Sequence, residues 1–393
     1  MSFKRLETAE LGGKTAIVRV DFNVPRDAAG KITDDTRIRA ALPTITYLQD
    51  KGAKIVLLSH FGRPKGQPNP EMSLRFIVPA LEGLLGKSVN FVEKPSGEMI
   101  AGLAQNSIIL VENTRFAAME TQGDPKMAQF LASLGDIFVM DAFSASHRNH
   151  ASSAVIGQFL PSYAGLAMER ELDHLAAALD HPKTPVMALV GGAKVSTKID
   201  LLENLVSRLD TLVIGGGMAN TFLYAQGHDV GASLCEKDLK AKALDILAAA
   251  KAENCEIILP IDVVAATEFK ANAESRVCGL DDVAPHEMIL DAGPDTVAAI
   301  LDVMETSKTL IWNGPLGAFE LTPFDTSTVE CAKYAAKLCR KDAIIAVAGG
   351  GDTVAALALA DVLDDFTFIS TAGGAFLEWM EGKPLPGVDI LKA

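Results

Sequence analysis

Apolar residues in this chain gather in short continuous runs that alternate with stretches of helical spacing. Residues 36–51, for example, place Ile38, Leu42, Ile45 and Leu48 on one face of a predicted helix. Continuous apolar runs between helices are typical of parallel strands that are covered on both faces. Strands of this kind are predicted in the first half over residues 15–20, 54–58, 107–111 and 137–140.

The second half repeats this pattern. Between the halves, Tyr163–Asp180 has the spacing of one long helix, which stops before Pro182 and Pro185 because proline cannot continue it. This segment fits an interdomain connector and an ordinary surface helix equally well. The whole pattern predicts an α/β protein of two doubly wound, Rossmann-like parallel-sheet lobes joined by a helix. The strands predicted in the second half span residues 186–190, 211–214, 257–259, 309–312, 343–347 and 366–369.

The length of 393 residues allows two or three domains. Asp and Glu number 50 against 36 Lys and Arg, so the formal charge is −14. An acidic surface repels polyanions, which argues against nucleic acid or an anionic membrane as a partner. No apolar run approaches the ~18 residues of a membrane helix, and no secretory signal is visible. The five cysteines, without CxxC spacing, fit buried thiols in a reducing cytoplasm.

Charged residues follow the predicted strands of the first half. Ligands of parallel sheets bind beyond the carboxyl ends of the strands. Arginine binds carboxylate and phosphate oxygens through its planar fork, so several arginines at one sheet edge indicate a small substrate with more than one anionic group. For any single arginine, a surface salt bridge is the alternative. The residues concerned are Asp21, Asn23, Arg37, His60, Arg63, Arg115, Asp141 and Arg148.

Glycines follow the predicted strands of the second half. Glycine lets a ligand approach the backbone closely, and the helix N-terminus that follows offers N–H groups to phosphate. Tight turns also need glycine, but the repetition favours a nucleotide or polyphosphate site. The turns are Gly191-Gly192, Gly215-Gly216-Gly217, Gly349-Gly350-Gly351, Gly373-Gly374 and Asn313-Gly314-Pro315.

Two common nucleotide motifs, GxxxxGK[ST] and GxGxxG, are absent from the glycine turns. Lys194 and Lys198 lie four residues apart, and we expect both to point along one helix face toward phosphates. Asp352 can cap the helix that it begins or hold Mg²⁺ beside phosphate oxygens. A metal site at His147 and His150 lacks a third ligand of matching spacing.

One lobe therefore suits a small polyanion and the other a nucleotide, which suggests phosphoryl transfer between lobes that close on each other. The sequence has no evident pair of nucleophile and base. A carboxylate acceptor needs no base, since it is ionised at pH 7.

Six segments resemble the phosphoglycerate kinase family, and the resemblance runs from Arg19 to Gly382. It implies a Mg²⁺-dependent, reversible transfer from 1,3-bisphosphoglycerate to ADP, which gives ATP and 3-phosphoglycerate in glycolysis without a covalent intermediate. The segments are Ser59-His-Phe-Gly-Arg-Pro64, Glu112-Asn-Thr-Arg-Phe116, Asp141-Ala-Phe-Ser-Ala-Ser-His-Arg148, Gly191-Gly-Ala-Lys-Val-Ser-Thr-Lys198, Trp312-Asn-Gly-Pro315 and Gly349-Gly-Gly-Asp-Thr353.

The resemblance also implies domains and roles. Residues 1–170 form the phosphoglycerate lobe, to which a tail of residues 380–393 returns, and residues 171–379 form the nucleotide lobe with the connecting helix. The lobes close about a hinge, and we expect a cytoplasmic monomer whose partners are small molecules alone. The implied phosphoglycerate ligands are Asp21, Asn23, Arg37, His60, Arg63, Arg115 and Arg148. The implied nucleotide ligands are Lys198, Gly215, Gly216, Asn313, Glu320, Gly350, Gly351, Asp352 and Thr353, with Glu320 at the ribose and Asp352 at Mg²⁺. Arg37, Lys194, Gly373 and Gly374 are expected around the phosphoryl group during transfer.

The chain departs from the family pattern at three positions. Ser144 and Ser146 stand where the family more often has Gly and Thr, and Ala372 stands where it often has glycine. None is expected to touch a charged site residue, and Ala372 predicts a negative φ, with any special backbone geometry left to Gly373 and Gly374. Two alternatives remain for the function: a kinase of a different carboxylic acid, and a two-lobed anion sensor without chemistry.

Overall fold

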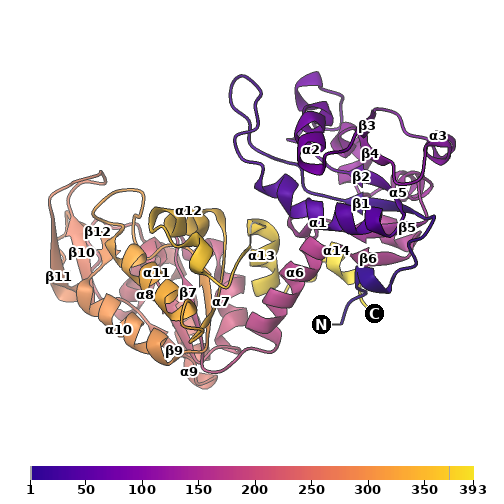
Figure 1. Cartoon of the computed structure of the whole chain (residues 1–393). Helices are drawn as coiled ribbons and strands as arrows, with labels where there is room; N and C mark the ends of the chain where they lie inside the picture. Colours follow the sequence, from indigo (N-terminus) through magenta and orange to yellow (C-terminus); the bar gives the residue numbers. More distant parts are fainter. Residues whose placement is uncertain (1, 371) are drawn as a thin grey trace. The chain divides into compact units, whose positions relative to one another are not determined.

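The structure, a computed structural model, describes residues 2–370 and 372–393. The chain forms two compact units, which Figure 1 draws in the colours of the sequence. The N-terminal unit comprises Met1–Asp173 and Pro384–Ala393, and the C-terminal unit comprises His174–Lys383. The chain thus crosses between the units slightly later than the boundaries at 170 and 380 that the sequence suggested.

An ion pair lies next to each of these crossings. Asp173 accepts a hydrogen bond from Arg5 Nη2 at 2.6 Å, which ties it to the N-terminal unit. Lys383 Nζ lies 2.8 Å from Asp200 Oδ2 within the C-terminal unit. The segment after Lys383 packs on the N-terminal unit, where Gly387 N donates to the backbone oxygen of Ser146 at 2.8 Å.

A six-stranded parallel sheet forms the centre of the N-terminal unit, in the order β3-β4-β2-β1-β5-β6. Its strands are β1 (Thr15–Arg19), β2 (Lys54–Leu58), β3 (Val89–Val92), β4 (Ile108–Val111), β5 (Ile137–Met140) and β6 (Ser162–Ala164). The helices are α1 (Thr36–Asp50), α2 (Val78–Leu85), α3 (Gly97–Gly102), α4 (Ala118–Thr121), α5 (Pro125–Ala132) and α14 (Pro386–Asp389). Every strand predicted in this half is present, together with β3 and β6, which were not predicted.

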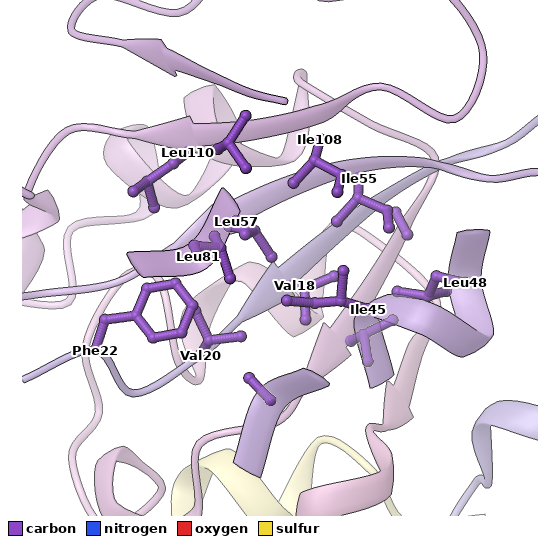
Figure 2. Close-up of a cluster of buried hydrophobic side chains, with 14 of the residues drawn as sticks. Val18, Val20, Phe22, Ile45, Leu48, Ile55, Leu57, Leu81, Ile108 and Leu110 are labelled. Atoms are coloured by element: carbon purple, nitrogen blue, oxygen red, sulfur yellow. The ribbon is translucent and has the colours of Figure 1, made fainter. Parts of the chain in front are cut away.

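The core of this unit lies between the sheet and helices α1 and α2, and Figure 2 shows part of it. Val18 of β1, Leu57 of β2 and Leu110 of β4 are fully buried beside Ile45 and Leu48 of α1. Each such side chain contributes about 1.5–3 kcal/mol when it leaves water. The strands predicted from apolar runs and the helix predicted from helical spacing therefore pack into one core. This core fixes the positions of the strand ends, after which the charged residues lie.

The predicted helix over Tyr163–Asp180 is shorter than expected. Tyr163 lies in β6, paired with Val139, because these residues complete the parallel sheet at its edge. Helix α6 spans Leu166–Leu175 and continues as a π-helical turn over Ala176–Asp180. The boundary between the two units falls within α6.

The C-terminal unit has a second six-stranded parallel sheet, in the order β15-β14-β13-β7-β8-β9. Its order reverses direction between β7 and β13, which is the point where doubly wound sheets bind ligands. The strands are β7 (Val186–Val190), β8 (Thr211–Ile214), β9 (Glu256–Ile258), β13 (Thr309–Asn313), β14 (Ile345–Gly349) and β15 (Phe368–Ser370). The helices are α7 (Ile199–Val206), α8 (Gly216–Gln226), α9 (Lys240–Ala252), α10 (Pro294–Thr306), α11 (Thr326–Cys339), α12 (Gly351–Leu359) and α13 (Gly373–Met380).

Two sheets of this kind confirm the predicted fold class. An additional antiparallel sheet, β11-β10-β12, was not predicted. Its strands are β10 (Asp262–Ala266), β11 (Ser275–Gly279) and β12 (Met288–Ala292). β10 and β12 contain short apolar runs, residues 263–266 and 288–290, for which no strand was predicted from the sequence. In β11, Val277 is 54% exposed, so this strand has no buried apolar pattern. Within the described residues, no helix is long and apolar enough to span a membrane.

Candidate active site

Basic side chains gather beyond the carboxyl ends of the strands in the N-terminal unit. Burial and the nearby charges of Arg19, Arg115, His150 and Arg37 hold the pKa of His60 well below its usual value. Arg115 in turn is close enough to Arg63 for their charges to interact. His150 is likewise close enough to interact with the charge of Arg148. We define the basic cluster as Arg37, His60, Arg63, Arg115 and Arg148. The structure brings these five predicted residues together, and their mutual repulsion indicates a place for an anion.

Asp21 and Asn23 hold parts of this cluster in place. Arg37, in the first turn of α1, donates from Nη1 to Asp21 Oδ2 at 2.7 Å. Asn23 Oδ1 accepts the N–H of Gly62 at 3.0 Å, and Arg115 Nη1 donates to the Gly62 carbonyl at 3.0 Å. The loop that carries Arg63 is therefore fixed from two sides. Arg115 Nε is buried and has no hydrogen-bond partner in the described structure, which leaves a donor for a ligand.

Ser144 corrects one expectation from the sequence. Its hydroxyl donates to Asp21 Oδ2 at 2.5 Å, the same oxygen that binds Arg37. The departure from the family pattern therefore does touch a charged site residue. Ser146 does not: it is buried, and its hydroxyl donates to the carbonyl of Phe143. Neither backbone takes a positive φ.

Asp141 also follows a strand but does not join the basic cluster. Its Oδ1 accepts the N–H of Ala167 at 2.9 Å and so caps the start of α6. Burial raises the pKa of this carboxyl to about 7. Position after a strand is therefore not sufficient to place a residue in the site.

An open pocket lies at the strand-order reversal of the C-terminal unit. Of the predicted nucleotide residues, Gly216, Glu320 and Asp352 line it, and Glu320 and Asp352 are exposed. Much of the remaining wall is apolar and was missed in the sequence, because its residues are scattered along the chain. This wall includes Leu234, Phe269, Met288, Leu290, Leu316 and Phe319. Phe269 is 63% exposed and Leu234 50% exposed, which is a surface that a flat aromatic ligand can cover.

Glycine is required where β7 and β13 end. A Cβ on Gly191 would lie 1.7 Å from the carbonyl oxygen of Pro315, so only glycine permits the two loops to approach. Gly350 has a φ of 102° and forms the N-cap of α12. Asp352 is therefore not the N-cap, as one reading of the sequence had it, but lies inside the first turn with its carboxylate exposed.

Lys198 is bound to protein oxygens. Its Nζ donates to Gly191 O at 2.5 Å, to Asn313 Oδ1 at 2.6 Å and to Asn313 O at 3.1 Å. Burial lowers the pKa of this ammonium to about 8, against a smaller opposing effect of Asp352. Because an ammonium has three donors, a phosphate oxygen can be bound only by replacing one of these partners.

The expectation that Lys194 and Lys198 share one helix face is wrong. A short 3-10 turn over Val195–Thr197 separates them, and Lys198 precedes α7. Lys194 has an extended backbone and is exposed, whereas Lys198 turns inward. The four-residue spacing has its helical meaning only inside a regular α-helix.

Asn313 and Thr353 stand behind the pocket rather than in its wall. Asn313 Nδ2 donates to Gly349 O at 2.7 Å, and the Thr353 hydroxyl accepts the N–H of Gly314 at 2.7 Å. Both side chains are buried. They hold the turns after β13 and β14 together. Gly215 is the N-cap of α8, and Gly351 is the first residue of α12.

Gly373 and Gly374 begin α13, next to the turn that begins α12. A Cβ on Gly373 would lie 3.5 Å from Gly350 Cα, an ordinary contact. The expected negative φ of Ala372 is confirmed at −103°. The expectation of a special backbone at the glycines is wrong, since Gly373 and Gly374 both have ordinary φ values because they are helical.

The chain matches the family model described as "Phosphoglycerate kinase" over residues 6–383. A phosphoglycerate kinase from Caulobacter vibrioides is 58% identical over 397 aligned residues, with 100% of both chains covered. One from Maricaulis maris is 60% identical over 389 residues, which cover 98% of this chain and 96% of that one.

Solved structures agree with these sequence matches. The phosphoglycerate kinase of Coxiella burnetii is 41% identical with a TM-score of 0.93, and the alignment covers 99% of each chain. That of Pyrococcus horikoshii is 29% identical with a TM-score of 0.77, covering 99% of this chain and 98% of the other. The chain belongs to the phosphoglycerate kinase family.

Proposed function

We propose how the two units divide the reaction of this family, the reversible transfer of a phosphoryl group from 1,3-bisphosphoglycerate to ADP. The chain is a phosphotransferase with a carboxyl group as acceptor, and its substrates are 3-phosphoglycerate and ATP in the reverse direction. The basic cluster of the N-terminal unit binds the phosphoglycerate. The pocket of the C-terminal unit binds the nucleotide. The observation that carries this proposal is the gathering of four arginines and His60 in the basic cluster.

Each group of residues has a chemical task in this proposal. Arg63, Arg115 and Arg148 bind anionic oxygens of phosphoglycerate, for which the guanidinium fork is suited. His60, Asp21 and Asn23 orient the molecule. The acceptor carboxylate is already ionised, so transfer is direct and needs no general base. Arg37, Lys194 and the N–H groups of Gly373 and Gly374 stabilise the charge that spreads over the phosphoryl oxygens.

Asp352 is the residue that we propose for Mg²⁺. Its exposed carboxylate lies in the pocket wall, and a single carboxylate suits an ion that is held mainly by nucleotide phosphates. The Asp352 carboxylate would help to hold Mg²⁺, which would supply positive charge against the nucleotide phosphates. Lys198 and the helix starts at Gly351 and Gly373 complete the phosphate surroundings. Hinge closure, a monomeric state and a cytoplasmic location remain predictions.

A coupled assay of the purified chain with ATP, Mg²⁺ and 3-phosphoglycerate tests the function. We expect steady turnover with 3-phosphoglycerate and at most trace turnover with acetate, aspartate or glycerate. Turnover with another acid in preference to 3-phosphoglycerate would establish a different carboxylate kinase. Binding of both ligands without turnover would establish an anion sensor.

The Ser144 hydroxyl is expected to support substrate binding through Asp21. Ser144→Ala removes one of the two side-chain donors that hold Asp21 Oδ2. The side chains of Asp21 and Arg37 are then held less firmly in one orientation. We expect the KM for 3-phosphoglycerate to rise about two- to tenfold, the net value of an ordinary hydrogen bond, because Ser144 acts on the substrate only through Asp21; the KM for ATP should be unchanged. Steady-state kinetics measure this, and Ser144→Thr, which keeps the hydroxyl, should restore most of the affinity. Equal KM values in the Ala variant and the wild type would contradict the role.

Nucleotide affinity is expected to fall in alkaline solution because of Lys198. Its pKa is about 8, so the charge is present below that pH and is lost above it. Since phosphate binding requires the charged form, the Kd for ADP should rise roughly tenfold between about pH 7 and pH 9. Calorimetric titration over this range measures the change. Lys198→Met should bind more weakly at all pH values and show a flat profile; a sloping profile in that variant would assign the effect to another group.

A further inference from the structure

Arg19 is a charged residue at the centre of the N-terminal unit. It ends β1, which pairs with β2 on one side and β5 on the other, and its side chain is only 1% exposed. In the sequence it reads as part of an apolar strand, and it has no place in the roles given above. A buried guanidinium is costly unless it is paired and hydrogen-bonded, so its partners identify its task.

A buried network holds the Arg19 side chain. Nη1 donates to the carbonyl of Val20 at 2.5 Å, and Nε donates to Ser152 Oγ at 3.0 Å. Ser152 donates in turn to Glu120, from Oγ at 2.5 Å and from its backbone N at 3.0 Å. Ser152 and Glu120 are fully buried, and the Glu120 carboxylate balances the charge of Arg19. The guanidinium therefore has one orientation.

The remaining nitrogen of Arg19 contacts His60. Arg19 Nη2 lies 2.9 Å from His60 Nδ1. A guanidinium has donors and no acceptor, so Nδ1 must contribute its lone pair to this hydrogen bond. The ring proton of a neutral imidazole then resides on Nε2. A proton on both nitrogens is disfavoured as well, because Arg115 and Arg37 add positive charge around the same ring.

We propose that Arg19 is a positioning residue that fixes His60 as the neutral Nε2–H tautomer, so that the ring presents a hydrogen-bond donor to the bound phosphoglycerate. The inference rests on the proposed function only for the identity of that ligand. The opposite tautomer would turn a lone pair toward an anion and replace attraction with repulsion. A hydrogen bond to a charged acceptor corresponds to about ten- to a hundredfold in affinity, and this is the effect that Arg19 controls without touching the substrate.

Nitrogen NMR of the full chain tests the tautomer directly. The probe is protein labelled with ¹⁵N at histidine, and His60→Gln identifies the His60 signals. In the ligand-free wild type at neutral pH, we expect a protonated Nε2 and an unprotonated Nδ1. A protonated Nδ1, or protons on both nitrogens, would overturn the proposal. This result does not depend on turnover, so a chain inactive in the coupled assay could still show the tautomer.

Kinetics test the consequence. Arg19→Met should raise the KM for 3-phosphoglycerate about tenfold or more and leave the KM for ATP unchanged, while His60 loses its single tautomer. Arg19→Lys, which keeps a donor, should restore part of the affinity for 3-phosphoglycerate and part of the preference of His60 for one tautomer. Arg5→Met removes a partly exposed arginine of the same unit that bonds to Glu169 and Asp173, and should change neither. If Arg19→Met folds and keeps both the tautomer and the KM, Arg19 has no positioning role. If the Arg19→Met variant does not fold, the ¹⁵N spectrum of the wild type alone decides whether His60 has the proposed tautomer.

Discussion

Arg37→Ala is expected to lower kcat by about a thousandfold or more, with a smaller change in either KM. This magnitude is typical of the loss of a donor that stabilises charge in the transition state. In the described structure the hydrogen bonds of Arg37 come from Nη1, to Asp21 Oδ2 at 2.7 Å and to Asn23 O at 3.3 Å. The guanidinium is therefore held in one orientation, and its other N–H groups can donate to a ligand. The side chain is 34% exposed.

Steady-state kinetics in both directions measure this effect, and thermal unfolding checks the fold. A partly exposed ion pair contributes at most about 1 kcal/mol, so the Arg37→Ala variant should remain folded. Arg39→Ala is the matched control: Arg39 lies on the same helix, pairs with Asp35 and is 59% exposed. It should keep wild-type kcat. If Arg37→Ala keeps kcat and only weakens 3-phosphoglycerate binding, Arg37 positions the substrate and does not act during transfer.

Asp352→Asn is expected to raise the Mg²⁺ concentration needed for half-maximal activity by about 10–100-fold. The substitution keeps the shape of the side chain but removes the charge that a divalent cation requires. Stability should change little, because Asp352 is exposed in the first turn of α12 and a carboxylate there contributes about 0.3–1 kcal/mol through the helix dipole.

Activity as a function of free Mg²⁺ measures this shift. Asp361→Asn is the control, since it makes the same charge change beyond the other end of α12, where Asp361 has a φ of 57° that asparagine also adopts. This control should keep the wild-type Mg²⁺ dependence. An unchanged dependence in Asp352→Asn, or an equal shift in both variants, would remove Asp352 from the metal site.

Most of the basic cluster was predictable because His60, Arg63, Arg115 and Arg148 lie in the loops that follow apolar runs. Each run sets a strand, the strands are parallel, and parallel strands deliver the residues after them to one edge. Arg37 was predictable from its place at the start of α1. The glycine turns indicated the nucleotide region for the same reason. Gly191 is required because the Pro315 carbonyl approaches it closely, and Gly350 because its φ is positive.

Other features depend on side-chain contacts between distant segments, which no local pattern records. Arg19 looks like one polar residue in a strand, and only the packing of Ser152 and Glu120 around it reveals a network. The bond from Ser144 to Asp21 joins residues 123 positions apart. The four-residue spacing from Lys194 predicted a helical position for Lys198, but Lys198 precedes helix α7. The apolar wall of the pocket comes from several separate segments, so no single window of sequence shows it.

Calorimetric titration of two variants with two ligands tests the division of substrates between the units. Arg115→Ala should weaken 3-phosphoglycerate binding by about tenfold or more and leave ADP binding within about twofold of the wild type. Lys198→Ala should do the reverse, weakening ADP and sparing 3-phosphoglycerate. This crossed pattern is what separate binding sites on the two units predict. If either variant weakens both ligands equally, or if Arg115→Ala weakens ADP instead, the assignment of substrates to the basic cluster and the pocket is wrong.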